Sequence, residues 1–560
     1  MRDLIVSILN AAIERARAAG QLVTAPPAAA SVEAPKDPAH GDAASNVALT
    51  MARSEKKPPR AIAEIIRANL ELPPEIAGAD VAGAGFINFR MAPAFWHGEL
   101  RRAAAEGERF WRPQIGAARK VQVEFLSANP TGPLTVGHGR NAVLGDTLAR
   151  MHEASGFVVT REYYFNNGGR QMRLLGESVR ARYLEEIGRP ATMPEDGYQG
   201  EYIRDIAREL VRRHGEALAD AADMEIFRAT AEEAIFADIR RTCERLGIRF
   251  DVFTNELDLI RGGQVDAVIE GLRERGLIAE YDGAVWLKGE PLGLPKDRVL
   301  VRSGPGREPT YRTPDIAYHI EKLRRGFDSV IDVFGADHIA EHQGVLAAVR
   351  ALGHDVAPIH AIIYQFVTLT RGGEKVKMST RKATYVTLDE LVDEVGADVV
   401  RFFFLFRKHD SHLDFDLDLA KRQAPENPVF YVQYAHARLA SVFREAEKKG
   451  IGLPAGVSSI DLASSIDLAP LLEEEIGLVR KLVNLPEVVR GAVESLEPHR
   501  VPFYLLELAG YFHRYYNKPS NRIISEQREL SLARLFLARL LMDGIKSGLD
   551  LLGVSAPDRM

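Results

Sequence analysis

The sequence predicts an α/β protein in which a doubly wound parallel sheet lies between an N-terminal α+β domain and a C-terminal all-α domain. Residues 120–164 read as strand, loop, helix and strand, the βαβ pattern of parallel sheets. After about residue 400 strand signals fade and helical periodicity continues to the end. The 560 residues exceed one domain of about 100–200 residues. We therefore expect domains over 1–112, 113–400 and 401–560.

The first domain begins with an amphipathic helix over residues 1–22, where apolar residues recur at helical spacing. A connector rich in proline and alanine follows. Two more helices are expected over 41–53 and 59–70, and the alternating segment 83–93 predicts a short strand. This mixture indicates a separate α+β domain.

In the middle domain, residues 121–125 and 157–164 predict two strands that flank a helix over 140–156. The charged, helical stretch 166–280 is interpreted as an insertion between the halves of a Rossmann-like sheet. Further strands are expected at 328–334 and 359–369. Long helical periods such as 428–449 then predict the all-α domain.

Composition excludes several classes of protein. Apolar residues make up 46% and charged residues 27%, so disordered and fibrous chains are set aside. No apolar run approaches the roughly 18–20 residues that span a bilayer, and the N-terminus lacks the pattern of an export signal. The single cysteine, Cys243, fits a reducing cytoplasm and a structural thiol better than a reactive one. With a net charge of −6, a nucleic-acid partner would need local basic patches.

The loop Ser127–Arg140 lies where doubly wound folds bind ligands, between the end of a strand and a helix N-terminus. Gly137, His138 and Gly139 would open that helix, where free N–H groups and the helix dipole favour phosphate. We expect the glycines to let a nucleotide approach and His138 to donate to the same anion. A tight turn with a capping histidine is an equally good interpretation of these residues alone.

The longer string EFLSANPTGPLTVGHGR resembles the first signature of class I aminoacyl-tRNA synthetases, in the form of arginyl-tRNA synthetases. Further matches follow in the family's order, and they are YYFNNGGRQMRLLGE, YRTPDIAYH, GADH, KVKMSTRK, RFFFLFRKHDSHLDFDLDLAK, NPVFYVQYAHARL, FHRYYNKPSNRI and GLDLLGVSAPDRM. With GDAASNVA and GFINF the resemblance covers essentially the whole chain.

The resemblance implies a two-step reaction. Arginine and ATP, with Mg²⁺, give arginyl-adenylate and pyrophosphate, and the arginyl group then moves to the 3′ end of tRNA(Arg). The family implies that tRNA is needed for the first step too. The chemistry is in-line attack at the α-phosphorus, so the protein positions groups and stabilises charge. We expect a cytoplasmic monomer without a structural metal and without membrane contact.

Two positions depart from the family's pattern. Thr135 stands where the first signature usually has histidine, so His138 is expected to carry more of the phosphate stabilisation. In the second signature, Thr380 replaces the second lysine. Lys377 and Arg381 are the predicted substitutes, with Mg²⁺ sharing the charge, in a glycine-flanked basic loop that can close over pyrophosphate. The resemblance places Met378 and Ser379 at ATP.

Acidic residues are predicted to select arginine. Glu124 lies within a predicted strand of a sheet covered on both faces and needs a cation, which is either the guanidinium of the substrate or a structural arginine. Thr313, Pro314 and Asp315 read as N-cap, N1 and N2 of a helix, so Asp315 could simply favour the helix dipole. The resemblance makes Asp315 the bidentate partner of the guanidinium. It adds six further residues, with Ser127, Asn129, Tyr311 and Gln343 at arginine, and with Asp337 and His338 beside the ATP site.

Aromatic residues beside basic groups suit the unstacked bases of an anticodon. Aromatics at helical spacing are also commonly core residues, and that alternative stays open. By resemblance the helical domain binds the anticodon and residues 1–112 contact the tRNA elbow. The residues predicted to bind tRNA are Tyr431, Tyr434, His436, Tyr515, Asn517 and Met560.

Two other interpretations remain. A small-molecule nucleotidyltransferase could share the sheet and the first signature, although residues 401–560 would then have no use. A catalytically inactive tRNA-binding paralogue would explain Thr135 and Thr380, but it would not explain the presence of Glu124, His138 and Asp315.

Overall fold

The structure is a computed structural model that describes residues 1–560 apart from 28–31, 34, 36, 222, 305–307, 377–385, 454–460, 462 and 463. Packing divides the chain into two compact units. The first comprises Met1–Gly107, Val442–Val483 and Tyr515–Leu541, and the second comprises Glu108–Ser441, Asn484–Arg514 and Met542–Met560. The C-terminal helical region, expected as one domain over 401–560, thus contributes to both units.

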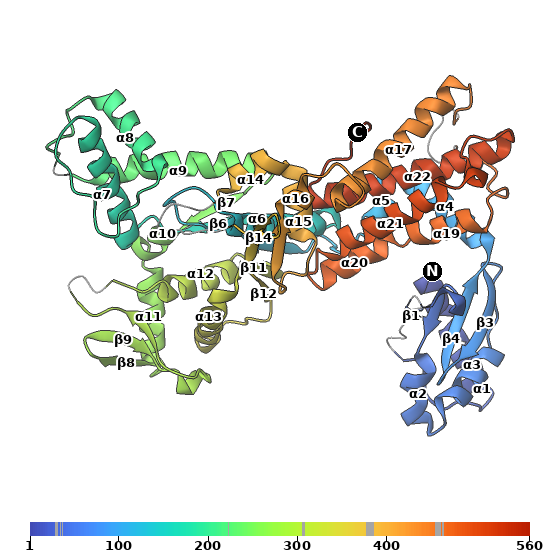
Figure 1. Ribbon diagram of the computed structural model, residues 1–560. Coiled ribbons are helices and arrows are strands. Elements are labelled where there is room, and N and C mark those ends of the chain that lie inside the picture. Colours follow the sequence, from blue (N-terminus) through green and yellow to red (C-terminus); the bar gives the residue numbers. More distant parts are fainter. Residues whose placement is uncertain are drawn as a thin grey trace. The chain divides into compact units, whose positions relative to one another are not determined.

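The N-terminal part of the first unit is a four-stranded sheet with three helices, coloured blue in Figure 1. The strands lie in the order β1-β2-β4-β3, all antiparallel. Helix α1 buries Ile5, Leu9 and Ile13, the apolar face that predicted it. The expected helix over 41–53 is shorter because its first residues form β2. The elements are α1 (Arg2–Ala18), β1 (Val32–Glu33), β2 (Ala43–Ser45), α2 (Val47–Glu55), α3 (Pro59–Ala68), β3 (Ile76–Ala82) and β4 (Phe86–Met91).

The main sheet of the second unit has five parallel strands in the order β12-β11-β5-β6-β7, which confirms the doubly wound fold. Helix α6 (Val136–Ala154) connects β5 to β6. Strand β7 lies inside the segment interpreted as a helical insertion, because its four residues are too few for a clear alternating pattern. The strands are β5 (Lys120–Glu124), β6 (Val158–Phe165), β7 (Val252–Asn255), β11 (Ser329–Gly335) and β12 (Ile359–Tyr364).

The segment expected as one strand over 359–369 is two strands in different sheets. Strand β12 belongs to the main sheet, whereas β13 pairs with β14 and β15 in a separate three-stranded sheet. Strand β15 lies beyond residue 400, where no strand was expected. The elements of this region are β13 (Val367–Arg371), β14 (Glu374–Lys375), α14 (Leu388–Val395), α15 (Ala397–Leu405), β15 (Leu413–Asp416) and α16 (Leu417–Ala420).

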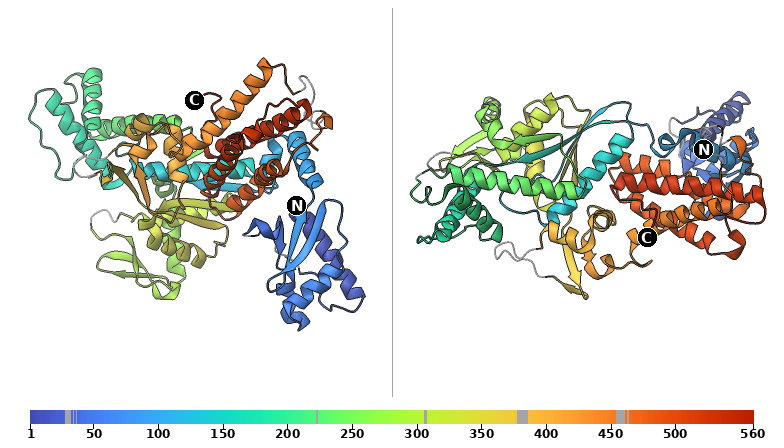
Figure 2. Two further views of the ribbon diagram at one scale, coloured as in Figure 1. Left: turned by 45° about the vertical axis from the view of Figure 1, so that its right-hand side comes forward. Right: turned by 90° about the horizontal axis from the view of Figure 1, so that it is seen from above.

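Between β6 and β11 the chain forms a helical group and a small sheet, green in Figures 1 and 2. Helices α7, α8 and α9 pack together, and α9 buries Cys243, where burial raises the pKa of the thiol to about 12. The small sheet has the order β10-β9-β8. The elements are α7 (Gly169–Glu186), α8 (Glu201–His214), α9 (Glu225–Arg245), α10 (Glu256–Arg261), α11 (Gln264–Glu274), β8 (Ile278–Tyr281), β9 (Ala284–Leu287), β10 (Arg298–Val301) and α12 (Arg312–Arg324), and α13 (Ile339–Ala351) follows β11.

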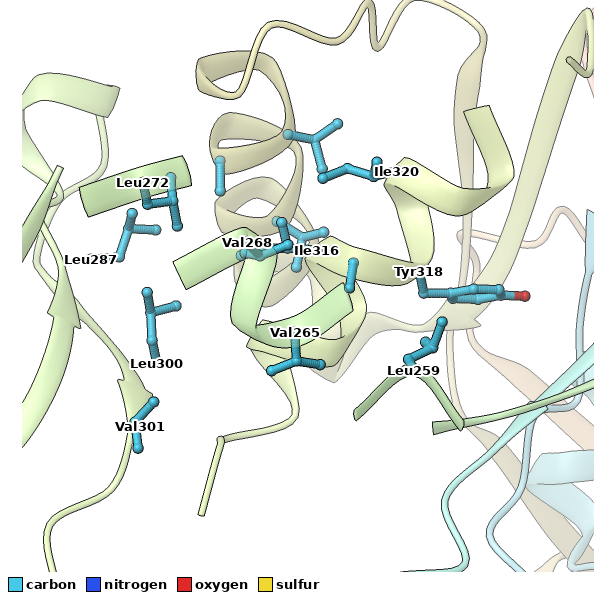
Figure 3. Packing of buried hydrophobic residues seen from close by; sticks show 14 of the residues in the cluster. Leu259, Val265, Val268, Leu272, Leu287, Leu300, Val301, Ile316, Tyr318 and Ile320 are labelled. Carbon is cyan, nitrogen blue, oxygen red and sulfur yellow. The ribbon is translucent and has the colours of Figure 1, made fainter. Parts of the chain in front are cut away.

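An apolar core holds α12 against α11 and the small sheet (Figure 3). Ile316 and Ile320 of α12 lie near Val268 of α11, while Tyr318 lies at the edge of the cluster with its hydroxyl directed away from it. Because a helix turns once in 3.6 residues, residues 315, 319 and 322 share a face adjacent to that of Ile316 and Ile320. Packing of the apolar face therefore sets the direction of the polar one.

The remaining helices are α4 (Pro93–Glu106), α5 (Glu108–Trp111), α17 (Pro428–Lys448), α19 (Glu473–Leu482), α20 (Leu485–Glu494), α21 (Arg500–Tyr516) and α22 (Arg528–Leu552). In the part of the chain that the structure describes, none of the helices has the length and apolar character needed to cross a bilayer.

Candidate functional site

Three carboxylates lie in register across the main sheet. Glu124 at the end of β5 pairs with Asp332 of β11 on one side and with Glu162 of β6 on the other. Glu162 is buried and accepts hydrogen bonds from Thr254 (2.6 Å) and Arg325 (2.7 Å). Burial alone would raise the pKa of Glu162, but these donors outweigh it and lower the pKa. Glu162 is therefore a structural acid with its own partners in the protein. The acids that could bind a ligand are Glu124 and its neighbours.

Helix α12 supplies the cation that Glu124 needs. Lys322 Nζ lies 2.5 Å from Glu124 Oε2 and 2.6 Å from Asp332 Oδ1. Burial opposes the charged ammonium, yet the two carboxylates outweigh it and raise the pKa of Lys322. The structural cation expected beside Glu124 is thus a lysine and not an arginine. The other carboxylate oxygen, Glu124 Oε1, accepts a hydrogen bond from Ser127 Oγ at 2.9 Å.

Asp315, one turn before His319 on the same face of α12, is the acid that the fold leaves without a cation. Its carboxylate makes no hydrogen bond or ion pair with any of the described residues. Burial, together with the nearby charges of Glu124, Glu256 and Glu341, raises the pKa of Asp315 to about 7 despite the opposing effect of His319. A buried carboxylate without a cationic partner is strongly stabilised in its ionised form when a cationic ligand binds beside it.

Glu256, the first residue of α10, is a second acid of the same kind. It is buried, and its oxygens accept hydrogen bonds from Tyr164 OH at 3.0 Å and from Asn166 Nδ2 at 2.7 Å. Burial raises the pKa of Glu256 to about 7, although these hydrogen bonds oppose the rise. Its charge contributes to the raised pKa of Asp315, so the two acids act on one another. Together they form a site for a desolvated cation.

The loop after β5 is strained where it passes this acid cluster. Leu126 and Ser127 have φ angles of 68° and 43°, a left-handed conformation that non-glycine residues rarely adopt. Asn141 of α6 holds the loop, because its Oδ1 accepts the Leu126 N–H at 2.6 Å and its Nδ2 donates to Val333 O at 2.9 Å. Strain of this kind is typical of ligand-binding loops.

The N-terminus of α6 forms as predicted, with Thr135 as N-cap and His138 in a capping box. The Thr135 N–H donates to His138 Nδ1 at 3.1 Å, so the neutral ring carries its proton on Nε2. Burial lowers the pKa of His138, which favours this neutral form. The capping interpretation of His138 is thus confirmed, because its Nδ1 caps the helix. The donation to phosphate stays a prediction, and the Nε2–H makes no hydrogen bond with the described residues.

The two glycines of the first signature serve different purposes. A Cβ at Gly139 would lie 2.6 Å from Leu388 and 2.9 Å from Phe404, so glycine is needed there for packing. At Gly137 the nearest atom would be the Thr135 hydroxyl at 3.7 Å. The expectation that both glycines admit a ligand is thus corrected for Gly139, whose missing side chain makes room for protein.

The second signature, with Lys377, Met378, Ser379 and Arg381, lies outside the described residues. The chain that follows it returns to the first signature, since Thr387 forms a β-bridge with Thr135 and the Leu388 N–H donates to Leu134 O at 2.8 Å. Before it, Arg371 is tied to Glu394 at 2.6 Å. The described residues that follow the second signature therefore lie against the first signature.

The other predicted arginine and ATP residues lie around the same edge of the sheet. Tyr311 is 57% exposed and is the N-cap of α12, so the helix begins two residues earlier than expected. Thr313 is the second residue of the helix and not its N-cap, because its hydroxyl donates to Leu300 O at 2.8 Å. Asn129 Oδ1 accepts the Asn166 N–H at 3.0 Å.

The 3₁₀ turn η3 (Ala336–His338) and helix α13 carry the remaining predicted site residues. Asp337 and His338 are exposed and follow β11, as predicted. Gln343 is exposed on α13, whereas the preceding His342 faces Asp332 and His319. The roles of Asp337, His338 and Gln343 stay predictions.

An aromatic and basic surface forms in the second unit, where Tyr431 and Tyr434 of α17 meet His513 of α21. The ring of His513 lies 4.5 Å from that of Tyr431 and stacks on Tyr434 at 5.6 Å. Arg438 lies over Tyr434 at 4.8 Å. Half-buried tyrosines next to arginine suit stacking of nucleic-acid bases.

For two predicted tRNA residues the core alternative holds. His436 is buried, and its Nδ1 contacts Pro557 O at 3.0 Å, so it holds the C-terminal segment. Tyr515 is buried in the first unit and donates to Glu475 at 2.8 Å. Neither ring is open to a base. Asn517 is exposed and Met560 is 53% exposed.

The sequence interpretation missed Glu256 and Lys322, which decide the charge of the site. Glu256 follows Asn255, whose side chain accepts the Leu257 N–H at 3.0 Å as an N-cap. An asparagine N-cap in a sequence indicates where a helix begins, but it does not indicate a functional role for the next residue. Lys322 follows Asp315 by seven residues, so helical spacing could have placed it on the acid face.

Comparison with known proteins identifies all three regions. The family model described as tRNA synthetases class I (R), catalytic domain, matches residues 99–402. The arginyl tRNA synthetase N terminal domain matches residues 3–91, and the DALR anticodon binding domain matches residues 432–560.

Individual relatives match over nearly the full length. A protein described as arginine–tRNA ligase from Desulfotalea psychrophila is 52% identical over 531 residues, which cover 95% of this chain and 94% of the relative. One from Salinibacter ruber with the same description is 48% identical over 549 residues, covering 94% and 95%. The solved arginyl-tRNA synthetase of Thermus thermophilus has the same fold, with a TM-score of 0.76, 24% identity and full coverage of both chains.

Proposed function

The chain belongs to the arginyl-tRNA synthetase family, and from this premise we infer that it is an arginine–tRNA ligase, an ATP-dependent enzyme that attaches arginine to tRNA. The observation that carries the choice of amino acid is the pair Asp315 and Glu256. Both carboxyls have a pKa of about 7 in the ligand-free site, and neither has a cationic partner among the described residues. A planar guanidinium can bridge two such carboxylates and restore their charge.

For the first step we propose in-line attack of the arginine carboxylate on the α-phosphorus of ATP. The N-terminus of α6 offers free N–H groups to the phosphates, and His138 Nε2–H adds a neutral donor. Lys377 and Arg381 are proposed to meet the leaving pyrophosphate from the second signature, with Met378 and Ser379 at the nucleotide. Asp337 and His338 are proposed to contact ATP from the end of β11.

The second step moves the arginyl group to the 3′ end of tRNA(Arg). We propose that arginine activation depends on bound tRNA, as the family resemblance implies. Ser127, Asn129, Tyr311 and Gln343 are proposed to orient the arginine, with Glu124 accepting from it while paired to Lys322.

Mg²⁺ is proposed to enter with the phosphates of ATP and to neutralise part of their charge. Among the described residues, His319, Asp332 and His342 form the group that resembles a metal site. Two imidazoles do not suit Mg²⁺, which prefers oxygen ligands, and Lys322 already holds Asp332. We therefore assign Mg²⁺ to the nucleotide and not to this cluster.

We propose that tRNA binds through the family's three domains, divided as 1–112, 113–400 and 401–560. Tyr431 and Tyr434 are the proposed anticodon contacts, with Asn517 and Met560 nearby, while His436 and Tyr515 act by supporting the fold. The proposed location is the cytoplasm, where tRNA and ATP are available, and the proposed state is a monomer.

One assay tests the function. We expect arginine-dependent exchange of pyrophosphate into ATP in the presence of tRNA(Arg), and little exchange without tRNA. A tRNA-independent exchange would refute the proposed tRNA requirement. No exchange under either condition would favour the inactive paralogue, and adenylation of a compound other than an amino acid would favour the nucleotidyltransferase. The lengthwise match to arginine–tRNA ligases favours neither alternative.

A further inference from the structure

Lys322 fills a position that is built for an ammonium ion. Its side chain is fully buried, and Nζ lies 2.5 Å from Glu124 and 2.6 Å from Asp332. The same ammonium lies 4.2 Å from the centre of the Tyr318 ring, a cation–π distance. Two carboxylates and an aromatic face thus enclose a compact tetrahedral cation.

The other acids around α12 fall into two groups. Glu162 is paired with Arg325 at 2.7 Å and Glu341 with Arg312 at 3.1 Å, so the protein neutralises both. Asp315 and Glu256 have no cation among the described residues. The protein thus supplies a cation to Glu124, Asp332, Glu162 and Glu341. Asp315 and Glu256 are the acids left for a ligand.

The two groups differ in the cation that they suit. A guanidinium is planar and offers parallel N–H donors, which two separate carboxylates can accept. An ammonium is a compact charge whose three donors point in different directions. Glu124 and Asp332 already show the geometry that an ammonium accepts, and Lys322 occupies it.

We propose that Lys322 is a specificity-determining residue of the amino-acid pocket. By placing the protein's own ammonium between Glu124 and Asp332, it closes that position to the side chain of free lysine and leaves Asp315 and Glu256 to the guanidinium of arginine. The inference rests on the proposed function, because it concerns the choice of substrate at the same site. It adds that arginine is selected partly through a lysine that the chain supplies.

A purely structural role for Lys322 makes a different prediction. Loss of a structural ion pair would lower stability and the rates with arginine and lysine by similar factors, which leaves their ratio unchanged. Under the proposal the ratio itself changes, because the vacated position favours an ammonium. The ratio of kcat/KM for arginine to kcat/KM for lysine is therefore the quantity to measure.

The test uses the full-length protein in amino-acid-dependent ATP–pyrophosphate exchange with tRNA(Arg) present. Lys322→Ala is expected to lower kcat/KM for arginine at least tenfold and to lower the arginine-to-lysine ratio at least tenfold. Methylammonium at millimolar concentration should partly restore both values in Lys322→Ala by filling the vacated position. It should not restore them in Lys322→Met, whose side chain fills most of the space.

Arg325→Met is the matched control, because Arg325 is the C-cap residue of the same helix and is the cation of another buried acid, Glu162. It is expected to reduce stability and rates while the ratio stays within twofold of the wild type. Should Lys322→Ala fail to fold, the double variant Lys322→Ala with Asp332→Asn removes one cation and one acid together, leaves the position beside Glu124 open, and should still lower the ratio at least tenfold.

A ratio within twofold of the wild type in folded Lys322→Ala, or in the double variant, would overturn the proposal. An equal loss of ratio in Arg325→Met would also overturn it, since the effect would then be general. Absence of arginine-dependent exchange in the wild type would instead refute the proposed function, so the two failures are distinguishable.

Discussion

Without a cation nearby, an ionised Asp315 destabilises the folded protein, and the same charge is proposed to bind arginine. Asp315→Asn should therefore change both the unfolding free energy and the arginine affinity. The pKa of Asp315 rises from an ordinary 3.8 to about 7, a difference that corresponds to ~4 kcal/mol. Because the folded state binds the proton more tightly, this acid lowers the unfolding free energy progressively from about pH 4 to pH 7 and fully above it. Asparagine cannot ionise, so the Asp315→Asn variant does not lose this part of the unfolding free energy.

We therefore expect Asp315→Asn to stabilise the ligand-free protein at pH 8 by up to ~4 kcal/mol, with little gain at pH 4. The figure is an upper bound because the side chain is only half-buried. Denaturant unfolding at the two pH values measures the effect. The same substitution should weaken arginine binding by about 2–5 kcal/mol, the usual cost of losing one partner of a buried charged pair.

Titration calorimetry without tRNA measures the arginine affinity directly. In the wild type the affinity should rise as pH increases through about 7, where Asp315 and Glu256 ionise, and the dependence should be weaker in Asp315→Asn. Asp266→Asn is the control, since Asp266 is an exposed acid in the first turn of α11. If Asp315→Asn lowered stability at pH 8 and matched the control in arginine affinity, Asp315 would be a helix-dipole residue and the reasoning would be wrong.

Four further outcomes are expected. Glu256→Gln should weaken arginine binding in calorimetry, and should do so more than Glu162→Gln, because Arg325 already neutralises Glu162. Gly139→Ala should destabilise the protein by about 1–3 kcal/mol in thermal unfolding, because the added Cβ would lie too close to Leu388 and Phe404. Gly137→Ala should have a smaller effect, because its Cβ would lie at an ordinary distance of 3.7 Å from the Thr135 hydroxyl. Thr135→His should change the rate of adenylate formation if position 135 acts on the phosphates, and an unchanged single-turnover rate would limit Thr135 to capping α6. Affinity for tRNA should fall steeply with salt in filter binding, and a flat response would count against phosphate contacts.

The sequence by itself determined the fold class, the order of the regions and the family. Strand β5, the loop and helix α6 were predicted because each is a local pattern, and the signature strings lie in them. Strand β7 was missed because its four residues show no clear alternation, whereas β15 does alternate but lies in a region that was interpreted as helical. The segment 359–369 was read as one strand because apolar composition does not reveal that a chain changes sheet.

The charge state of the site was decided by tertiary structure. Glu124, Asp332 and Glu162 are brought together by strand register, and Lys322 reaches two of them because the apolar face of α12 packs on α11. The identity of Glu124 and Asp315 as acids was evident from the sequence, but which one keeps a free charge was not. A pairing between groups 198 residues apart depends on how helices pack, and helix packing follows from the shape of the whole core.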